Sequence, residues 1–141
     1  MNFQSFHDKF PALAEKETRT ITVFKNNDFG LPADDYTFVE LFCNVAKCDC
    51  RRVFFQVFSM KRRQSEAIIC WGWENAAFYK KWMGYADKQM LAEMIGPCLN
   101  VGSPQSPLAP ALLNLFSKLL LNDVTYTNRV KNHYAMFKKK L

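Results

Sequence analysis

Residues 36–60 read YTFVELFCNVAKCDCRRVFFQVFSM, and they decide the fold because two apolar runs flank a cysteine-rich connection. The first run, Tyr36–Cys43, is rich in aromatic and β-branched residues, which favour strands. The second run, Arg52–Met60, is apolar at both odd and even positions, as expected for a central strand covered by helices on one face and at least partly on the other. We therefore predict two strands, with Arg52–Met60 in the middle of a sheet.

Two further segments extend this sheet. Arg19–Lys25 reads RTITVFK and ends at a turn rich in Asn and Gly, while Ala67–Trp73 reads AIICWGW and follows a polar turn at Lys61–Ser65. Both segments have strand composition, and Ala67–Trp73 is placed to pair back on the central strand as a hairpin. We expect an antiparallel β-meander of about four strands within residues 19–73.

The apolar period becomes helical after residue 75. Caps, prolines and apolar stripes predict four helices over about residues 75–140, which begin near Asn75, Asp87, Ser106-Pro107 and either Asp123 or Thr125. A short N-terminal helix is predicted at Phe3–Leu13, where apolar residues recur every three or four positions and Pro11 begins or bends the helix. Strands followed by helices are typical of the α+β class, here a meander packed against C-terminal helices.

Length and composition indicate one domain over residues 1–141. The chain is 49% hydrophobic and contains thirteen Phe, which excludes a disordered chain. Charged residues near the N-terminus argue against a secretory signal, so we expect a cytoplasmic protein. The uncharged stretch 94–117 contains four prolines, so we interpret it as a loop and a helix and expect no membrane association.

Three of the five cysteines, Cys43, Cys48 and Cys50, fall within eight residues between the two central strands. We call residues 43–50 the cysteine knuckle. If the flanking strands pair, Cys43 leaves one strand as Cys50 approaches the next, and Cys48 lies in the connection between them. Convergent thiolates select zinc or iron–sulfur chemistry over magnesium or calcium. We predict a bound zinc ion, with an iron–sulfur cluster as the less favoured alternative.

A closed zinc site needs a fourth ligand. We favour His133, because it lies on the apolar stripe of the last helix, where an inward imidazole needs a polar partner. Cys98 is the main rival, and Cys70 and His7 are the other candidates. Other interpretations of the knuckle are unliganded structural thiols and a redox-active or catalytic thiol. Arg51 and Arg52 are expected to offset the negative charge of the thiolates.

The run Phe38–Arg52, taken with Gly72-Trp73-Glu74, Trp82, Pro104-Gln105-Ser106 and His133-Tyr134, resembles an uncharacterised bacterial protein family that carries a C-x4-CDCRR motif. The resemblance spans most of the chain. It implies that Cys43, Cys48 and Cys50 act as a unit, and it implies no activity.

The remaining patterns favour a binding protein over an enzyme. No Ser-His-Asp order, phosphate-binding glycine loop or dinucleotide fingerprint is present. The leading hypothesis is a zinc-stabilised module that binds another macromolecule, a protein rather than a nucleic acid. The net charge of +6 and short basic clusters such as Lys61-Arg62-Arg63 and Lys138-Lys139-Lys140 motivate the first alternative, a nucleic-acid binder. The second alternative is a metal–thiolate enzyme or redox sensor whose fourth coordination position is open.

Overall fold

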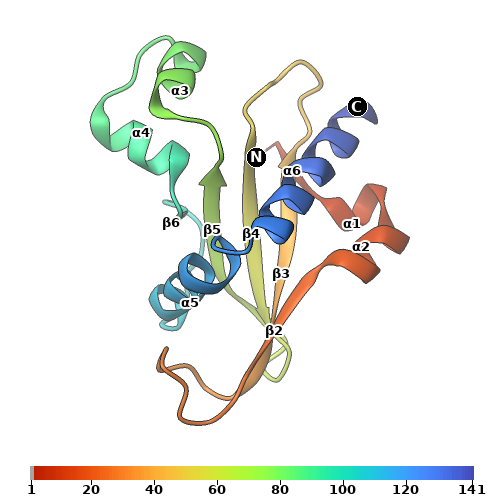
Figure 1. Ribbon diagram of the computed structural model, residues 1–141, viewed down its shortest axis with the longest axis vertical. Coiled ribbons are helices and arrows are strands. Elements are labelled where there is room, and N and C mark those ends of the chain that lie inside the picture. The colour runs from red at the N-terminus through yellow and green to blue at the C-terminus, as the bar shows by residue number, and fades with distance from the viewer. Residues whose placement is uncertain (1) are drawn as a thin grey trace.

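Three long antiparallel strands form the centre of the molecule in the computed structural model, which describes residues 2–141 (Figure 1). β3 (Asp34–Cys43) pairs with β4 (Arg52–Ser59), and β4 pairs with β5 (Gln64–Gly72). The sheet follows the order β1-β3-β4-β5-β6, so β4 is central, as its apolar residues at both alternations predicted. The α+β class and the antiparallel sheet are confirmed, although the sheet has six strands instead of about four.

The N-terminal segment differs from the predicted helix at Phe3–Leu13. Its first residues form β1 (Phe3–Ser5), which pairs with residues 41–43 of β3. Phe3 contributed to the apolar spacing that suggested a helix, but it packs against the sheet instead. Its ring stacks on Phe54 of β4 with centroids 4.1 Å apart. Two short helices and a strand follow, namely α1 (Phe6–Lys9), α2 (Pro11–Glu17) and β2 (Arg19–Val23).

β1 and β2 share one edge of β3. β2 pairs with residues 34–38 and β1 with residues 41–43, so the chain runs along this edge in two pieces. The helices α1 and α2 leave the sheet between the two pieces, beside Val39 and Glu40. On this edge, the interruption gives Glu40, whose side chain is buried, helical neighbours, while on its other edge Glu40 pairs with Phe55 of β4.

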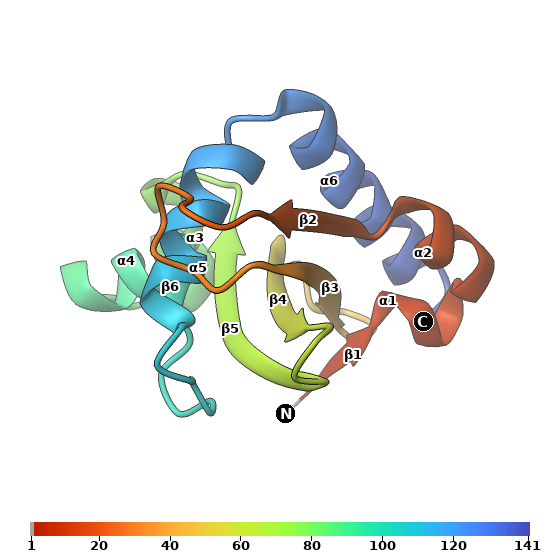
Figure 2. The ribbon, with the colours of Figure 1, turned by 90° about the horizontal axis from the view of Figure 1, so that it is seen from below.

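The last helices cover one face of the sheet, as Figure 2 shows for α5 and α6 above β3, β4 and β5. α5 (Ala109–Leu115) begins two residues after the predicted Ser106-Pro107 start and continues through a π-helical turn, η1 (Phe116–Leu120), before α6 (Val124–Lys139). Asp123 is the cap of α6, since its carboxylate accepts a hydrogen bond from the Tyr126 N–H at 3.1 Å.

The two middle helices project beyond the end of β5 (Figure 1). α3 (Ala76–Met83) is capped by Asn75 and α4 (Lys88–Ile95) by Asp87, as predicted. We call residues 76–95 the α3–α4 arm. It returns to the sheet through β6 (Cys98–Leu99), a two-residue strand that the sequence did not predict, paired with Ile69 and Cys70 of β5.

Alternation along the strands produces two apolar clusters. The larger one lies between the sheet and the helices and contains residues such as Tyr36, Phe38, Val57, Ile69, Leu112 and Phe137. The smaller one comes from the opposite alternation and contains Phe54, Ile68 and Cys70, packed by Phe3, Leu41 and Cys98. The prediction that the central strand is covered at least partly on its second face is therefore confirmed.

Candidate metal centre

The structure brings the three knuckle cysteines together. Cys43 ends β3, and Cys48 and Cys50 follow in the connection to β4. Their three Sγ atoms all lie within 4.8 Å of one another. Cys43 and Cys50 are buried, and Cys48 is half-buried. Because Cys48 is partly exposed, this group of thiols is accessible from the surface.

The geometry and the donor set suit a tetrahedral thiophilic ion. With zinc–sulfur bonds of about 2.3 Å, two thiolates on a tetrahedral zinc are about 3.8 Å apart. The observed upper limit of 4.8 Å is therefore within a small side-chain adjustment of that value. A metal site with three cysteine ligands is thus supported, and its thiolate donors suit soft ions such as zinc.

Two side chains of α6 hold the knuckle against the sheet. The backbone N–H of Arg51 donates to the Tyr134 hydroxyl at 3.0 Å, and the Lys138 ammonium donates to the Val45 carbonyl at 3.1 Å. Arg51 has a positive φ of 48°, a conformation that is strained for a residue with a side chain. These contacts satisfy backbone groups of an irregular loop and fix the direction in which Cys50 leaves it.

The three thiols differ in their tendency to ionise. Burial alone would raise the pKa of Cys43, but hydrogen bonds from the Val45 backbone and the Cys48 thiol, with the charge of Lys138, outweigh it and lower that pKa. Burial, with the hydrogen bond and charge of the Cys43 thiolate, raises the pKa of Cys48. Burial raises the pKa of Cys50 to about 12, and the Cys48 thiolate adds to the effect. Cys43 is thus the thiol that ionises first, and a cation would be needed to hold all three as thiolates.

The cation beside the thiols is Lys138. The prediction that Arg51 and Arg52 offset the negative charge of the thiolates is wrong. The Arg51 guanidinium pairs with Asp49 at 2.9 Å and Glu74 at 3.5 Å, so carboxylates already neutralise it. The Arg52 guanidinium points to the other side of β4 and donates to the Met94 carbonyl at 2.9 Å. The Arg52 guanidinium lies over the Phe54 ring, which belongs to the smaller apolar cluster, whereas Cys50 belongs to the larger one on the opposite face of the sheet.

The prediction of His133 as the fourth ligand is also corrected. His133 is buried, as its place on the apolar stripe implied, but both of its ring nitrogens are engaged elsewhere. Nδ1 lies 2.7 Å from Glu40 Oε1 and Nε2 lies 2.7 Å from Glu17 Oε1. Its ring also stacks on Phe6, with centroids 4.2 Å apart. The polar partner that an inward imidazole requires is a pair of carboxylates, and no nitrogen remains to bind a metal.

This carboxylate–imidazole–carboxylate arrangement changes the ionisation of His133. Burial disfavours the charged imidazolium, but the hydrogen bond and charge of Glu40, followed by those of Glu17, outweigh burial and raise the pKa of His133. His133 and Glu40 are 1% and 2% exposed, so this ion pair lies inside the core. Through these contacts His133 joins α6 to β3 and α2.

The other candidate ligands lie elsewhere as well. Cys70 and Cys98 meet each other, with their Sγ atoms 3.1 Å apart. His7 Nε2 lies 3.5 Å from the Thr18 hydroxyl. Within residues 2–141, no other cysteine and no histidine or carboxylate joins the three knuckle thiols. The described residues therefore offer three ligands, and the fourth position on a tetrahedral ion would be left for another ligand.

Several functional features were not visible in the sequence. Tyr134 and Lys138 lie four residues apart on α6, and this spacing places them on one face of the helix. The spacing was the one available signal that both residues act on the same loop. The Cys70–Cys98 contact had no signal, because it depends on the register of a two-residue strand.

Comparisons with protein-family models, with curated protein sequences and with solved structures found no match. The resemblance to the C-x4-CDCRR family therefore stays a prediction. Among residues 2–141, no helix is long and apolar enough to cross a membrane.

Proposed function

We propose that the protein is a zinc-binding module that holds one ion with Cys43, Cys48 and Cys50 and acts by binding another protein. The observation that carries the proposal is the convergence of the three Sγ atoms within 4.8 Å of one another. A bound zinc ion would stabilise the thiolate forms and tie the end of β3 to the start of β4. Because reduced thiols persist in reducing compartments, we also propose that the protein acts in the cytoplasm.

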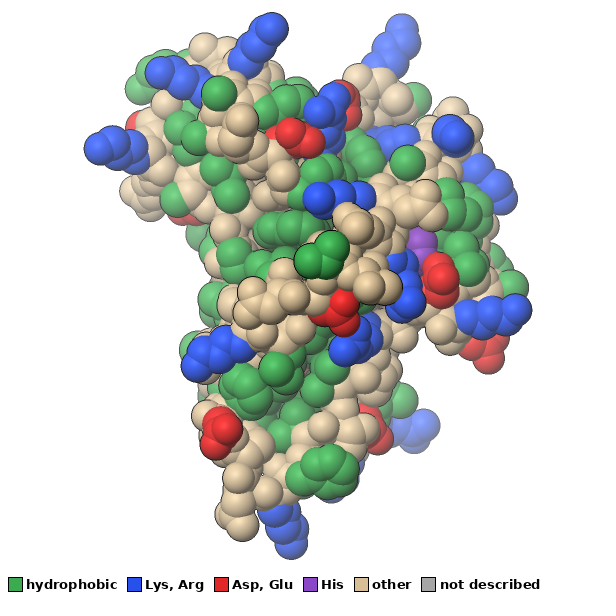
Figure 3. Space-filling view, viewed as in Figure 1, with side chains coloured by type: hydrophobic (Ala, Val, Ile, Leu, Met, Phe, Trp, Pro, Cys, Tyr) green, Lys and Arg blue, Asp and Glu red, His purple; other side chains and the backbone are tan. Residues whose placement is uncertain are grey.

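The arginine side chains favour a protein partner over a nucleic acid. Five of the six arginines are engaged within the chain through ion pairs or hydrogen bonds to backbone carbonyls, namely Arg19, Arg51, Arg52, Arg62 and Arg129. Figure 3 shows that Lys and Arg side chains on the viewed face are separated from one another and interspersed with acidic and apolar ones. Nucleic-acid binding relies on basic side chains that are free to neutralise successive phosphates.

The zinc content of purified, untagged protein tests the metal site. We expect about one zinc per chain in the wild type and its loss in Cys48→Ser. Cys98→Ser is the matched control, since Cys98 is also half-buried and lies outside the knuckle, and it should retain zinc. His133→Gln should retain zinc too, because the His133 ring nitrogens bind carboxylates. A wild type without zinc, or a Cys48→Ser variant with full zinc content, would contradict the proposal.

Binding experiments test the partner class. We expect a protein partner to be retained by the wild type and by Cys98→Ser, and to be lost after zinc removal or in Cys48→Ser. Binding of DNA or RNA that weakens steeply as salt rises would instead support the nucleic-acid alternative.

A second candidate function is suggested by the absence of a fourth ligand among residues 2–141. With three protein thiolates, the fourth position on zinc is available to water, to a substrate or to a partner's ligand atom, as in catalytic or sensing sites. Substitution of zinc by cobalt tests this candidate. A change in the visible spectrum on adding cyanide or imidazole would show an open position, and an unchanged spectrum would show a closed one.

A further inference from the structure

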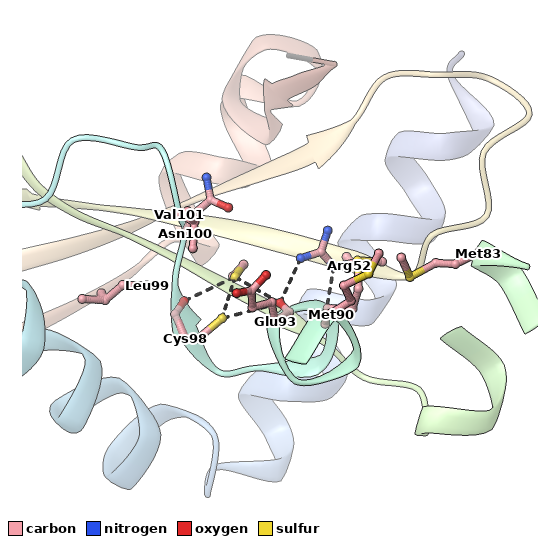
Figure 4. A pocket seen from close by; sticks show the side chains of 10 residues that line it. Arg52, Met83, Met90, Glu93, Cys98, Leu99, Asn100 and Val101 are labelled. Carbon is pink, nitrogen blue, oxygen red and sulfur yellow. Dashed lines mark hydrogen bonds between the residues drawn. The ribbon is translucent and has the colours of Figure 1, made fainter. Parts of the chain in front are cut away.

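Cys70 and Cys98 form a second pair of thiols, separate from the knuckle. They are directly opposite each other in the antiparallel pairing of β5 and β6, and their Sγ atoms are 3.1 Å apart (Figure 4). Directly opposed residues of antiparallel strands have Cα atoms about 4.5 to 5.5 Å apart, which lies within the range that a disulfide spans. Bond formation at about 2.05 Å requires the sulfurs to approach by about 1 Å.

The backbone around Cys98 is fixed in this position. Gly96 lies so close to β5 that a Cβ atom there would be 2.3 Å from the Cys70 carbonyl oxygen. After Cys98, the Asn100 N–H donates to the Ile68 carbonyl at 2.9 Å. The Gln105 side chain also bonds to both backbone groups of Ile68, at 3.0 and 2.9 Å. Contacts on both sides of Cys98 therefore hold the two thiols in register.

Small molecules can reach this pair through a cavity. The cavity has a volume of about 280 Å³, and its lining includes both cysteines, Glu93 and the apolar side chains of Met90 and Met94 (Figure 4). Cys98 is half-buried, whereas Cys70 is 2% exposed and burial raises its pKa to about 12. Cys98 is thus the thiol that meets a reagent first, and Cys70 lies behind it as the resolving thiol.

We propose that Cys70 and Cys98 form a reversible dithiol–disulfide couple that is oxidised by hydrogen peroxide entering this cavity. The Cys98 thiolate attacks a peroxide oxygen, so that an S–O bond forms and the O–O bond breaks, and the departing hydroxide takes up the thiol proton as water. Cys70 then attacks the Cys98 sulfur. The S–S bond forms, the S–O bond breaks, and hydroxide leaves with the Cys70 proton as a second water. Two thiols lose two electrons, and one peroxide is reduced to two waters.

The disulfide would fix the α3–α4 arm to the sheet, because it closes the loop of residues 71–97. The arm has little burial of its own, since α3 buries only Tyr79 and α4 buries no residue. In the reduced protein, the arm is held mainly by hydrogen bonds such as Tyr79 Oη to the Arg51 carbonyl at 2.8 Å and Arg52 Nε to the Met94 carbonyl at 2.9 Å. A covalent link at the end of the arm would reduce its local opening.

Thiol mapping after oxidation tests the proposal. Reduced, zinc-loaded wild type is treated with stoichiometric hydrogen peroxide, alkylated and digested for mass spectrometry. We expect free thiols to fall from five to three, with the loss of two hydrogen atoms and a linked peptide pair that contains Cys70 and Cys98. A thiol reductant should restore all five thiols. Hydrogen exchange over Lys88–Ile95 should slow several-fold in the oxidised form.

The controls separate this pair from the knuckle. Cys98→Ser should form no disulfide under the same treatment, and its zinc content should equal that of the wild type, so failure of the metal proposal would leave this test intact. Alkylation of both Cys70 and Cys98 after peroxide treatment would overturn the proposal, and so would linkage of either one to a knuckle cysteine. Mapping of the wild type needs no variant, so a Cys98→Ser protein that failed to fold would not prevent the test.

Discussion

The cysteine knuckle and the Cys70–Cys98 pair both bring thiols together, but they do so by different means. The knuckle collects three cysteines from eight consecutive residues and depends on Tyr134 and Lys138 to shape an irregular loop. The pair joins residues far apart in sequence through the register of a sheet. A loop adjusts its side chains around an ion, whereas two opposed strands hold two sulfurs at one separation. The first arrangement suits metal binding and the second suits a covalent bond.

The largest expected effect on the free energy of unfolding comes from replacing His133, and it tests whether His133 belongs to the metal site. Replacing His133 with Ala leaves the buried Glu40 carboxylate without its partner, and loss of one member of a buried ion pair costs about 3 to 5 kcal/mol. We expect this loss in urea unfolding while zinc content stays at the wild-type level. Concurrent loss of zinc from folded His133→Gln, which keeps a hydrogen-bond donor for Glu40, would show instead that His133 serves the metal site.

The second-largest effect on the free energy of unfolding should come from removing zinc from the knuckle. With free zinc about 100-fold above the dissociation constant, binding stabilises the folded state by about 2.7 kcal/mol, and a chelator should remove this contribution. Urea titrations with zinc and with chelator measure the difference. Cys98→Ser should show the same difference as the wild type and Cys48→Ser should show none. Equal dependence on zinc in both variants would contradict the distinction between the two thiol sites.

The dependence of stability on pH should report the His133 ion pair. The folded state raises the pKa of His133, so its contribution is fully present below the ordinary imidazole pKa of about 6.5 and is lost as pH rises through the raised value. The slope from one proton is at most about 1.4 kcal/mol per pH unit.

Subtracting the free energy of unfolding of His133→Gln from that of the wild type separates the contribution of His133 from that of the thiols. Wild type and His133→Gln are unfolded in urea at a series of pH values, both with chelator present. The difference in free energy of unfolding should decrease with rising pH. A difference that is constant, or that increases, would contradict the assignment.

A smaller effect tests the contacts that Tyr134 and Lys138 of α6 make with the loop around the knuckle, which we call the clamp. Tyr134→Phe removes the hydroxyl that accepts the Arg51 N–H, which should cost about 1 kcal/mol and speed the release of zinc to a chelator. Tyr126→Phe is the matched control, because the Tyr126 hydroxyl is buried on the same helix and makes no hydrogen bond within residues 2–141. Equal zinc release from the two variants would show that the clamp does not act on the metal.

The smallest effect concerns the second thiol pair in its reduced state. Under reducing conditions, Cys98→Ser should change the free energy of unfolding by no more than about 0.5 kcal/mol, because Cys98 is half-buried and forms no covalent bond there. After mild oxidation, the wild type should become more stable than Cys98→Ser. Urea titrations in both redox conditions measure this, and an unchanged difference would argue against a disulfide in the folded protein.

Local patterns explain which features were predictable. The central position of β4 followed from apolar residues at both alternations, and the convergence of the knuckle thiols followed from their short spacing. The burial of His133 followed from its helical stripe. Its partners did not, because periodicity indicates which face a residue occupies and not what lies opposite. Glu17 and Glu40 reach His133 only after α2 and β3 have been placed in the fold.

The missed strands have a related explanation. β1 and β6 contain three and two residues, too few to express a period of two. Their positions are set by tertiary contacts, namely the stacking of Phe3 on Phe54 and the close approach of Gly96 to Cys70. For the same reason, the Cys70–Cys98 contact had no counterpart in the spacing of cysteines along the chain.

The clamp from α6 also has a consequence for biosynthesis. Tyr134 follows Arg51 by 83 residues, so at 5 to 20 residues per second it is synthesised roughly 4 to 17 s later. During this interval, the nascent chain carries the knuckle thiols without the helix that shapes their loop. A zinc ion captured in that time would hold the loop closed before α6 arrives, and an oxidant would meet these thiols at their least protected. Given this order of translation, early capture of a metal would protect the growing chain.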